Sequence, residues 1–186
     1  MTATSAGTIP GYVAGTWAID TVHSEVGFSV RHMMVSKVRG KFTKFSGEIV
    51  TADDVFSSTV TAEIDLSSID TGNEQRDGHI RSADFFDVEN HPLMTYRSTG
   101  LRAAGDHYIL DGDLTLRGVT RSVPLTLELN GFGPDAYGGT RAGFTATGEI
   151  TRQDFGVNWN AAIEAGGVVL SDKVSINLEI EAVLQA

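Results

Sequence analysis

Apolar and polar residues alternate along most of the chain from Trp17 onward, which is the pattern of β-strands with one buried face. The run 174–181 shows it most clearly, with Val, Ile or Leu at every even position and Ser, Asn or Glu between them. Eight such runs follow one another, and the second changes phase by one residue between Phe42 and Phe45, as a β-bulge would produce. Their inward positions are Val22, Val26, Phe28 and Val30; Val38, Gly40, Phe42, Phe45, Gly47 and Ile49; Val60, Ala62, Ile64 and Leu66; Met94 and Tyr96; Tyr108, Leu110, Gly112, Leu114 and Leu116; Val123, Leu125, Leu127 and Leu129; Ala142, Phe144, Ala146 and Ile150; and Val174, Ile176, Leu178 and Ile180.

This strand pattern predicts an all-β fold. Eight strands that are apolar on one face can form a closed barrel or a two-sheet sandwich. Because the runs follow one another without a long crossover, an eight-stranded antiparallel up-and-down barrel is favoured, and closure removes exposed sheet edges. Small residues at inward positions either leave room for one small ligand or relieve the curvature of the barrel. These small residues are Gly40, Gly47, Gly112, Ala62, Ala142 and Ala146.

The connections between the runs differ in length, and in an up-and-down barrel every second connection opens at the same end. The connections at one end are 31–37, 67–92, 117–122 and 151–172, and those at the other end are 51–57, 100–106 and 131–140. Long loops gathered at one end indicate the mouth of the barrel. Inside the 67–92 connection, we expect a short helix within 71–86, with Thr71 as its N-cap and Glu74 completing a capping box.

Composition narrows the classes of protein that fit this fold. The 186 residues include 14 basic and 24 acidic side chains, for a formal net charge of −10, and no cysteine. This balance argues against binding to nucleic acid or to an anionic membrane surface, and the lack of cysteine excludes disulfides and thiolate chemistry. No stretch is long and apolar enough for stable membrane insertion. Residues 1–14 are small and polar without the features of a secretory signal, so we expect a flexible N-terminal arm, one barrel domain over 15–186, and a cytoplasmic location.

The sequence contains no nucleophile motif, phosphate loop or dinucleotide fingerprint. If the strands bring them together, His23, His32 and His79 are candidates for a metal or catalytic site. Asp77 and Asp84 with His79 are candidates for an acid–base set. The alternative is that these side chains form hydrogen bonds and ion pairs that fix loops.

Two clusters, 84–87 and 152–160, combine charged side chains with aromatic rings in long loops. Their charged residues can pair to hold the loops, while the rings either plug the barrel or line the entrance for an apolar ligand. Met33 and Met34 stand in the first loop of the mouth, where flexible thioethers suit an adaptable apolar contact but also serve as core fillers.

Five segments in fixed order carry a family resemblance. They are WAIDTVHSEVGFSVRH (17–32), DGHIRSADFFDV (77–88), LTLRGVT (114–120), DFGVNWN (154–160) and LSDKV (170–174). Over about 17–184, the sequence resembles the YceI-like, polyisoprenoid-binding family. This resemblance implies an extended, lipocalin-like eight-stranded antiparallel barrel with an apolar tunnel. It also implies binding of a long isoprenoid or another amphipathic lipid, with no established enzymatic step.

The favoured interpretation is a noncatalytic protein that carries or sequesters such a lipid, with the tail in the barrel and the headgroup at the mouth. An isoprenoid or fatty-acid-like lipid is the expected partner, without cofactor, metal or nucleic acid, and a homodimer is left open. The expected tail contacts are Phe28, Val30, Met33, Met34, Val38, Phe42, Ile64, Leu66, Phe144 and Trp159. The expected headgroup contacts are His32, Arg76, His79 and Asn158. The competing interpretation is an enzyme or metal-binding protein with a site built on His23, His32 and His79.

Overall fold

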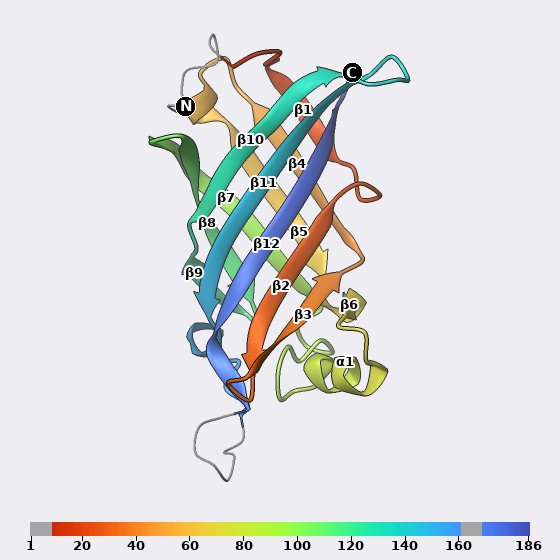
Figure 1. Cartoon of the computed structure of the whole chain (residues 1–186), viewed down its shortest axis with the longest axis vertical. Helices are drawn as coiled ribbons and strands as arrows, with labels where there is room; N and C mark the ends of the chain where they lie inside the picture. The colour runs from red at the N-terminus through yellow and green to blue at the C-terminus, as the bar shows by residue number, and fades with distance from the viewer. Residues whose placement is uncertain (1–8, 161–168) are drawn as a thin grey trace.

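The computed structural model describes residues 9–160 and 169–186, which form a closed antiparallel β-barrel with one short helix at one end (Figure 1). The predicted all-β class is therefore confirmed. The strands are β1 (Gly15–Ile19), β2 (Glu25–His32), β3 (Ser36–Phe42), β4 (Phe45–Thr51), β5 (Thr59–Asp65), β6 (Ile69–Asp70), β7 (Leu93–Ala104), β8 (His107–Leu116), β9 (Val119–Ser122), β10 (Leu125–Pro134), β11 (Thr140–Thr151) and β12 (Leu170–Leu184). The α-helix is α1 (Glu74–Arg81), and short 3₁₀ helices cover Val55–Ser57, Leu66–Ser68 and Arg152–Phe155.

The twelve strands of the described residues make eight barrel positions, because several positions are interrupted. β1 and β2 both pair with β12, with Trp17 opposite Leu184 and Phe28 opposite Ile176, so they occupy one position in succession. On their other side β1 pairs with β4 and β2 pairs with β3, so β3 and β4 share the next position. β6 pairs with β3 and shares one barrel position with β5. β9 pairs with β8 and shares one barrel position with β10. The predicted eight-stranded antiparallel barrel is thus confirmed.

The predicted β-bulge in the second run is a break between two strands. β3 ends at Phe42 and β4 begins at Phe45. Between them, the amide of Thr43 donates to the carbonyl of Ser68 (3.2 Å), so the backbone at this point is bonded outside the regular ladder. A bulge and a break both shift the side-chain phase by one residue, and the sequence pattern alone does not separate them.

The first predicted run begins too early. Val22 is 84% exposed and lies in the turn between β1 and β2, and the strand starts at Glu25. The amide of Val22 donates to the Asp20 carboxylate (2.9 Å). This local side-chain hydrogen bond stabilises a turn and competes with strand pairing.

The helix expected within 71–86 is present as α1, but its N-cap is Asn73 and not Thr71. The carboxamide oxygen of Asn73 accepts a hydrogen bond from the amide of Arg76 (2.9 Å). The Thr71 hydroxyl instead donates to the buried carboxylate of Asp77 and accepts from Nε of Arg76 (2.7 Å). Asn and Thr both cap helices, so residue type does not decide between the two positions.

The connections gather at two ends of the barrel as predicted. The β2–β3 hairpin, α1, the β8–β9 turn and the 3₁₀ helix after β11 lie at the lower end in Figure 1, which we call the mouth end. The opposite end carries the shorter turns after β4, β7 and β10. Residues 161–168 of the predicted 151–172 connection, and residues 1–8 of the predicted arm, lie outside the described residues.

Candidate functional site: an apolar cavity inside the barrel

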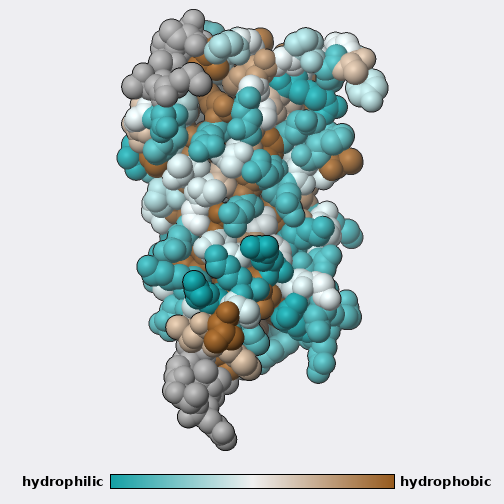
Figure 2. Space-filling model, viewed as in Figure 1, coloured by the Kyte–Doolittle hydropathy of each residue, from teal (hydrophilic) through white to brown (hydrophobic). Residues whose placement is uncertain are grey.

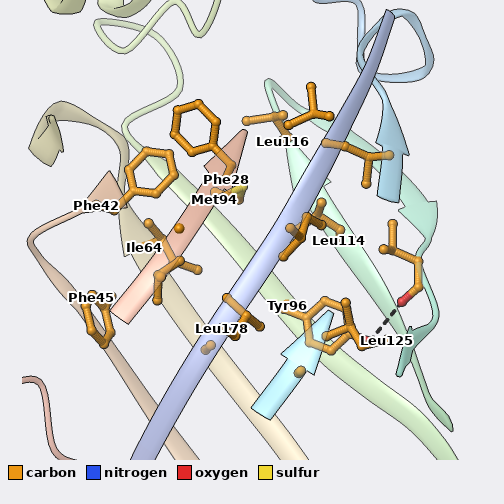
Figure 3. Close-up of a pocket in the computed structure, with 18 of the residues that line it drawn as sticks. Phe28, Phe42, Phe45, Ile64, Met94, Tyr96, Leu114, Leu116, Leu125 and Leu178 are labelled. Carbon is orange, nitrogen blue, oxygen red and sulfur yellow. Dashed lines mark hydrogen bonds between the residues drawn. The ribbon is translucent and has the colours of Figure 1, made fainter. Parts of the chain in front are cut away.

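A cavity of about 440 Å³ occupies the interior of the barrel. Figure 3 shows side chains from β2, β3, β4, β5, β7, β8, β10 and β12 pointing into it. The surface of the cavity is almost wholly apolar. Its volume falls in the range of roughly 300–1,000 Å³ that is typical of small-molecule sites. The cavity therefore suits an apolar ligand.

The cavity is deep, as the register of β12 shows. The even-numbered residues from Val174 to Ile180 all line it. Val174 and Leu178 each face lining residues on both neighbouring strands; Leu178, for example, lies between Val26 of β2 and Ala146 of β11. The six residue steps from Val174 to Ile180 span about 20 Å at ~3.3 Å per step, or about 15 Å along the axis of a barrel whose strands tilt by ~40°. Lining residues continue beyond both ends of this ladder.

Two of the inward glycines are covered by aromatic rings and do not leave empty space. Gly40 lies directly opposite Phe28, and a Cβ at Gly40 would collide with the Phe28 ring. In the same way, a Cβ at Gly112 would collide with the ring of Tyr96. These glycines allow large rings to lie flat against the next strand. The small inward residues that do line the cavity are Ala62 and Ala146.

An aromatic group closes the end opposite the mouth. Trp17 is fully buried, and its indole NH donates to the hydroxyl of Thr51 (2.8 Å). The ring of Phe132 packs edge-on against Trp17 and Tyr12, with centroid separations of 5.7 and 5.3 Å. The Tyr12 hydroxyl donates to the carbonyl of Ala52 (2.6 Å). Tyr12 falls within the predicted flexible arm, and sequence reasoning missed it; the signal was a single large ring in a segment of small residues.

At the mouth, the imidazole of His79 lies between two aromatic rings. Its centroid is 4.8 Å from that of Trp159 and 5.1 Å from that of Phe85, both in edge-on geometry. Nε2 of His79 is 2.8 Å from a carboxylate oxygen of Asp84. Because His79 and Trp159 both line the cavity, this group places a polar ring at the edge of an apolar space.

Arg76 is a second polar group of the mouth that lines the cavity. Its guanidinium donates to the hydroxyl and to the carbonyl of Thr71, each at 2.7 Å. Asp77 is only 4% exposed, and it accepts from the amide and the hydroxyl of Thr71. Thr71 therefore links the helix to the strand before it and holds the Arg76 side chain in place.

Arg152 is buried and organises the turn after β11. Its guanidinium donates to the carbonyls of Ser171 (2.9 Å), Val157 (3.0 Å) and Trp159 (3.1 Å). The carboxylate of Asp172 is farther away, at 3.9 Å. Burial lowers the pKa of Arg152 from its usual value. Arg152 thus holds its loop through backbone carbonyls rather than through the carboxylate pairing expected from sequence.

Tyr96 places one hydroxyl within the apolar part of the cavity. This hydroxyl donates to the carbonyl of Val123 (2.9 Å). Burial, with the nearby carboxylates of Asp111 and Asp113, raises the pKa of Tyr96 above its usual value. The phenol therefore stays neutral, and its proton is already bonded to the backbone.

Ten of the fourteen predicted contact residues line the cavity. Most are strand residues at the expected inward positions, and the others come from the mouth. They are Phe28, Val30, His32, Val38, Phe42, Ile64, Arg76, His79, Phe144 and Trp159. Their role in binding a ligand stays a prediction.

Four predicted contact residues do not line the cavity. Met33 and Met34 lie in the β2–β3 turn with positive φ values of 51° and 63°, and both side chains are exposed. Leu66 is fully buried in a 3₁₀ helix, because β5 ends one residue before it at Asp65. Asn158 is exposed in the loop after Phe155. Alternation predicts only Leu66 as an inward residue, whereas Met33, Met34 and Asn158 are predicted as contacts from their place in loops at the mouth.

The three histidines of the competing interpretation are not brought together. His23 precedes β2 and His32 ends it, so the length of this eight-residue strand separates them. His32 and His79 both line the cavity at the mouth. Within the described ranges, the cluster with metal-ligand spacing is instead Asp20, His23 and Glu181.

Arg141 already pairs with both carboxylates of that cluster. Its Nη1 lies 2.7 Å from Asp20 and 2.8 Å from Glu181, and its Nε lies 3.0 Å from Asp135. Hydrogen bonds from His23 and Arg141 hold the pKa of Asp20 well below its usual range. This arrangement is an ion-pair network that joins β12, the β1–β2 turn and the β10–β11 turn.

The fold and the cavity define a class of protein, an antiparallel barrel that encloses an apolar space with polar groups at its mouth. The YceI-like domain matches residues 17–182, and the chain belongs to this family. A UPF0312 protein of Staphylococcus epidermidis is 38% identical over 167 residues, covering 87% of this chain and 94% of its own.

Two solved structures share the fold. A YCEI protein of Campylobacter jejuni is 28% identical, with a TM-score of 0.72 and coverage of 90% of this chain and 96% of its own. A polyisoprenoid binding domain from Saccharophagus degradans has a TM-score of 0.69 at 18% identity, with coverage of 93% and 100%. In the part of this chain that the structure describes, no helix has the length and apolar character needed to cross a membrane.

Proposed function

We propose that this protein binds a polyisoprenoid or another long-chain amphipathic lipid in the barrel cavity, and that it carries or sequesters this lipid without a chemical step. The observation that carries the proposal is the form of the cavity. It is deep, lined almost wholly by apolar surface, closed by the Trp17 and Phe132 rings at one end, and its basic side chains lie at the mouth. A single long chain with one polar end has the matching distribution of polarity.

The energetics favour a long tail. Burying one CH₂ group contributes roughly 0.8 kcal/mol, and drug-sized ligands retain about 0.3 kcal/mol per atom after the costs of binding. A five-carbon isoprene unit thus contributes about 1.5–4 kcal/mol, which is a factor of roughly ten to several hundred in Kd. Affinity should therefore come mainly from chain length.

The mouth residues suit an oxygen-rich or anionic headgroup. Arg76 and His79 line the cavity there, and His32 lies nearby at the end of β2. All three side chains can donate hydrogen bonds to oxygen. We propose these three residues as the headgroup contacts. Asn158 does not line the cavity and is left out of this set.

Family membership and the solved neighbours support the same assignment. The Saccharophagus degradans domain, which shares this fold, is described as binding polyisoprenoid. The proposed function of the present chain rests on its own cavity, and the neighbour shows that this barrel architecture is compatible with such a ligand.

Native mass spectrometry of the purified protein tests the proposal. We expect a noncovalent adduct with the mass of a long-chain lipid, and the same mass in an organic extract. Phe28→Asp should remove the adduct, because it places a carboxylate on an apolar cavity surface. Glu25→Ala is the matched control on the same strand, since Glu25 is exposed, and it should keep the adduct.

Two results would contradict the proposal. One is a protein that carries no lipid and takes up none from isoprenoid or fatty-acid mixtures. The other is equal lipid retention by folded Phe28→Asp and Glu25→Ala variants, with folding checked by circular dichroism.

A further inference from the structure

The tip of the β2–β3 hairpin is an exposed apolar surface at the mouth of the barrel. Met33, Met34 and Val35 are 43%, 54% and 83% exposed. We call these three residues the hairpin tip. Figure 2 shows apolar surface at the lower end of this face, with strongly hydrophilic residues above it. None of the three lines the cavity, so filling the barrel does not explain why they are apolar.

The backbone conformation of the tip is also less favourable for methionine than for glycine, asparagine or aspartate. Met33 and Met34 both have left-handed φ values, 51° and 63°, a conformation that Gly, Asn or Asp adopts more readily. The turn is tied to the neighbouring strand position, because the amide of Met33 donates to the carbonyl of Val169 (2.7 Å), the residue before β12. Two thioethers and a valine are therefore held outward at a turn where small polar residues would be both more stable and better hydrated.

The strands next to the tip carry a concentration of positive charge. Five of the 14 basic residues of the chain lie between positions 31 and 44, and this segment contains no Asp or Glu. Against residues 9–160 and 169–186, none of the five forms an ion pair, whereas Arg102 and Arg141 elsewhere are paired with carboxylates. The five residues are Arg31, Lys37, Arg39, Lys41 and Lys44.

We propose that the hairpin tip and the adjacent cations form a docking surface for an anionic lipid bilayer. The tip inserts among the headgroups, the cations bind lipid phosphates, and the mouth of the cavity then faces the membrane. The surface goes beyond the proposed lipid-binding function, since docking requires only the outside of the hairpin. Its consequence is that a lipid could enter the barrel without crossing bulk water.

Distance from the hairpin tip determines which of the five basic residues can interact with a membrane that the tip contacts. Arg31 and Lys37 face each other one residue pair from the base of the turn. Arg39 lies about 7 Å farther along β3 at ~3.3 Å per residue, still within the Debye length of ~8 Å at physiological ionic strength. Lys41 lies opposite Asp70 of β6. Lys44 is more than about 20 Å from Lys37 along the chain and lies beyond reach of a surface that the tip contacts.

This local distribution changes the expectation drawn from net charge. The total of −10 predicts no attraction to an anionic membrane when it is treated as a single charge. Screening restricts the electrostatic interaction to groups within about one Debye length of the surface. Near the tip those groups include Arg31, Lys37 and Arg39, while Asp172 and Lys173 of the neighbouring β12 carry opposite charges that offset each other. A protein that is acidic overall can therefore dock through one basic edge.

Flotation of the full chain with lipid vesicles tests the proposal. One set of vesicles contains phosphatidylcholine alone, and the other contains equal amounts of phosphatidylcholine and phosphatidylglycerol. We expect binding to the anionic vesicles only, with about a fivefold loss for each cation removed near the surface, so about 25-fold for Arg31→Gln with Lys37→Gln. Lys44→Gln is the charge control, and it should bind like the wild type.

The apolar part of the surface has its own control. Met34→Ser with Val35→Ser should weaken vesicle binding, whereas Tyr137→Ser, at a 90% exposed ring in the β10–β11 turn, should not. All of these side chains are exposed, so folding is retained. A lack of binding by the wild type, equal losses for Lys44→Gln and Lys37→Gln, or tip variants that change only the oligomeric state would overturn the proposal. None of these results depends on whether the cavity holds a lipid, so failure of docking and failure of the proposed function are distinguishable.

Discussion

Filling the cavity from one wall should shorten the lipid that the barrel accepts. Ala146 is 5% exposed and lines the cavity on β11, where it lies between Leu127 of β10 and Leu178 of β12. Ala146→Phe adds about six carbon atoms, close to one five-carbon isoprene unit, to a space that the tail would occupy. A chain that fills the cavity then loses about 1.5–4 kcal/mol, which is roughly ten- to several-hundred-fold in Kd. A shorter chain, whose tail stops between the mouth and Ala146, loses no affinity.

Quenching of tryptophan fluorescence provides the assay, since Trp159 lies at the mouth and Trp17 at the closed end. Prenyl lipids that differ by one isoprene unit are titrated into Ala146→Phe and into Thr147→Phe. Thr147 is exposed on the outer face of the same strand, so its variant controls for the added ring. A weaker affinity for short and long chains alike, or equal effects of the two variants, would refute the assignment of Ala146 to the lipid tunnel.

Tyr12→Ala should lower the free energy of unfolding by about 2–4 kcal/mol in urea denaturation, because it removes a ring that packs on Phe132; an unchanged unfolding midpoint would contradict the role of Tyr12 in closing the barrel. Acid should destabilise the fold through Asp20, whose pKa is held below its usual range by His23 and Arg141. A depressed carboxyl pKa contributes stability that is complete above the unfolded value of about 3.9 and is lost as pH falls through the native value. Arg141→Gln should therefore lower stability at pH 7 and flatten the fall in the urea midpoint below about pH 4, and equal slopes for the two proteins would contradict the coupling.

The barrel was predictable because its physics is repeated along the chain. Each strand must bury one face, so an alternation such as that of 174–181 reports the fold and the inward side chains together. Val30 and Phe144 lie on the cavity surface for this reason. The same alternation of strand direction decides which connections share an end of the barrel, and it predicts that His79 and Trp159 lie at the same end.

The errors come from places where a strand stops. Alternation continues through Leu66 in the sequence, but the Asp65 carboxylate accepts from the amide of Ser67 (2.9 Å) and starts a 3₁₀ helix. Met34 continues an apolar run, but its backbone turns into the left-handed region and its side chain leaves the interior. Local hydrogen bonds and turn geometry decide these positions, and they are weakly encoded in hydrophobicity.

Tyr12 and the histidines show a different limit. Tyr12 packs against a β10 residue more than a hundred positions away, a contact that no local pattern reports. His23 and His32 share a short stretch of sequence, yet they lie at opposite ends of β2. Contacts of this kind depend on the closed topology, which has to be known before they can be inferred.

The dependence of affinity on chain length tests the central claim most directly. The Kd of the wild-type protein would be measured for prenyl alcohols of increasing length at low and high salt. An apolar tail in a closed cavity predicts at least about tenfold tighter binding per isoprene unit until the cavity is full, then a plateau. It also predicts little response to salt, because burying hydrocarbon releases no counterions. Affinity that is indifferent to chain length but falls steeply with salt would contradict binding in the cavity and place the ligand on the polar surface.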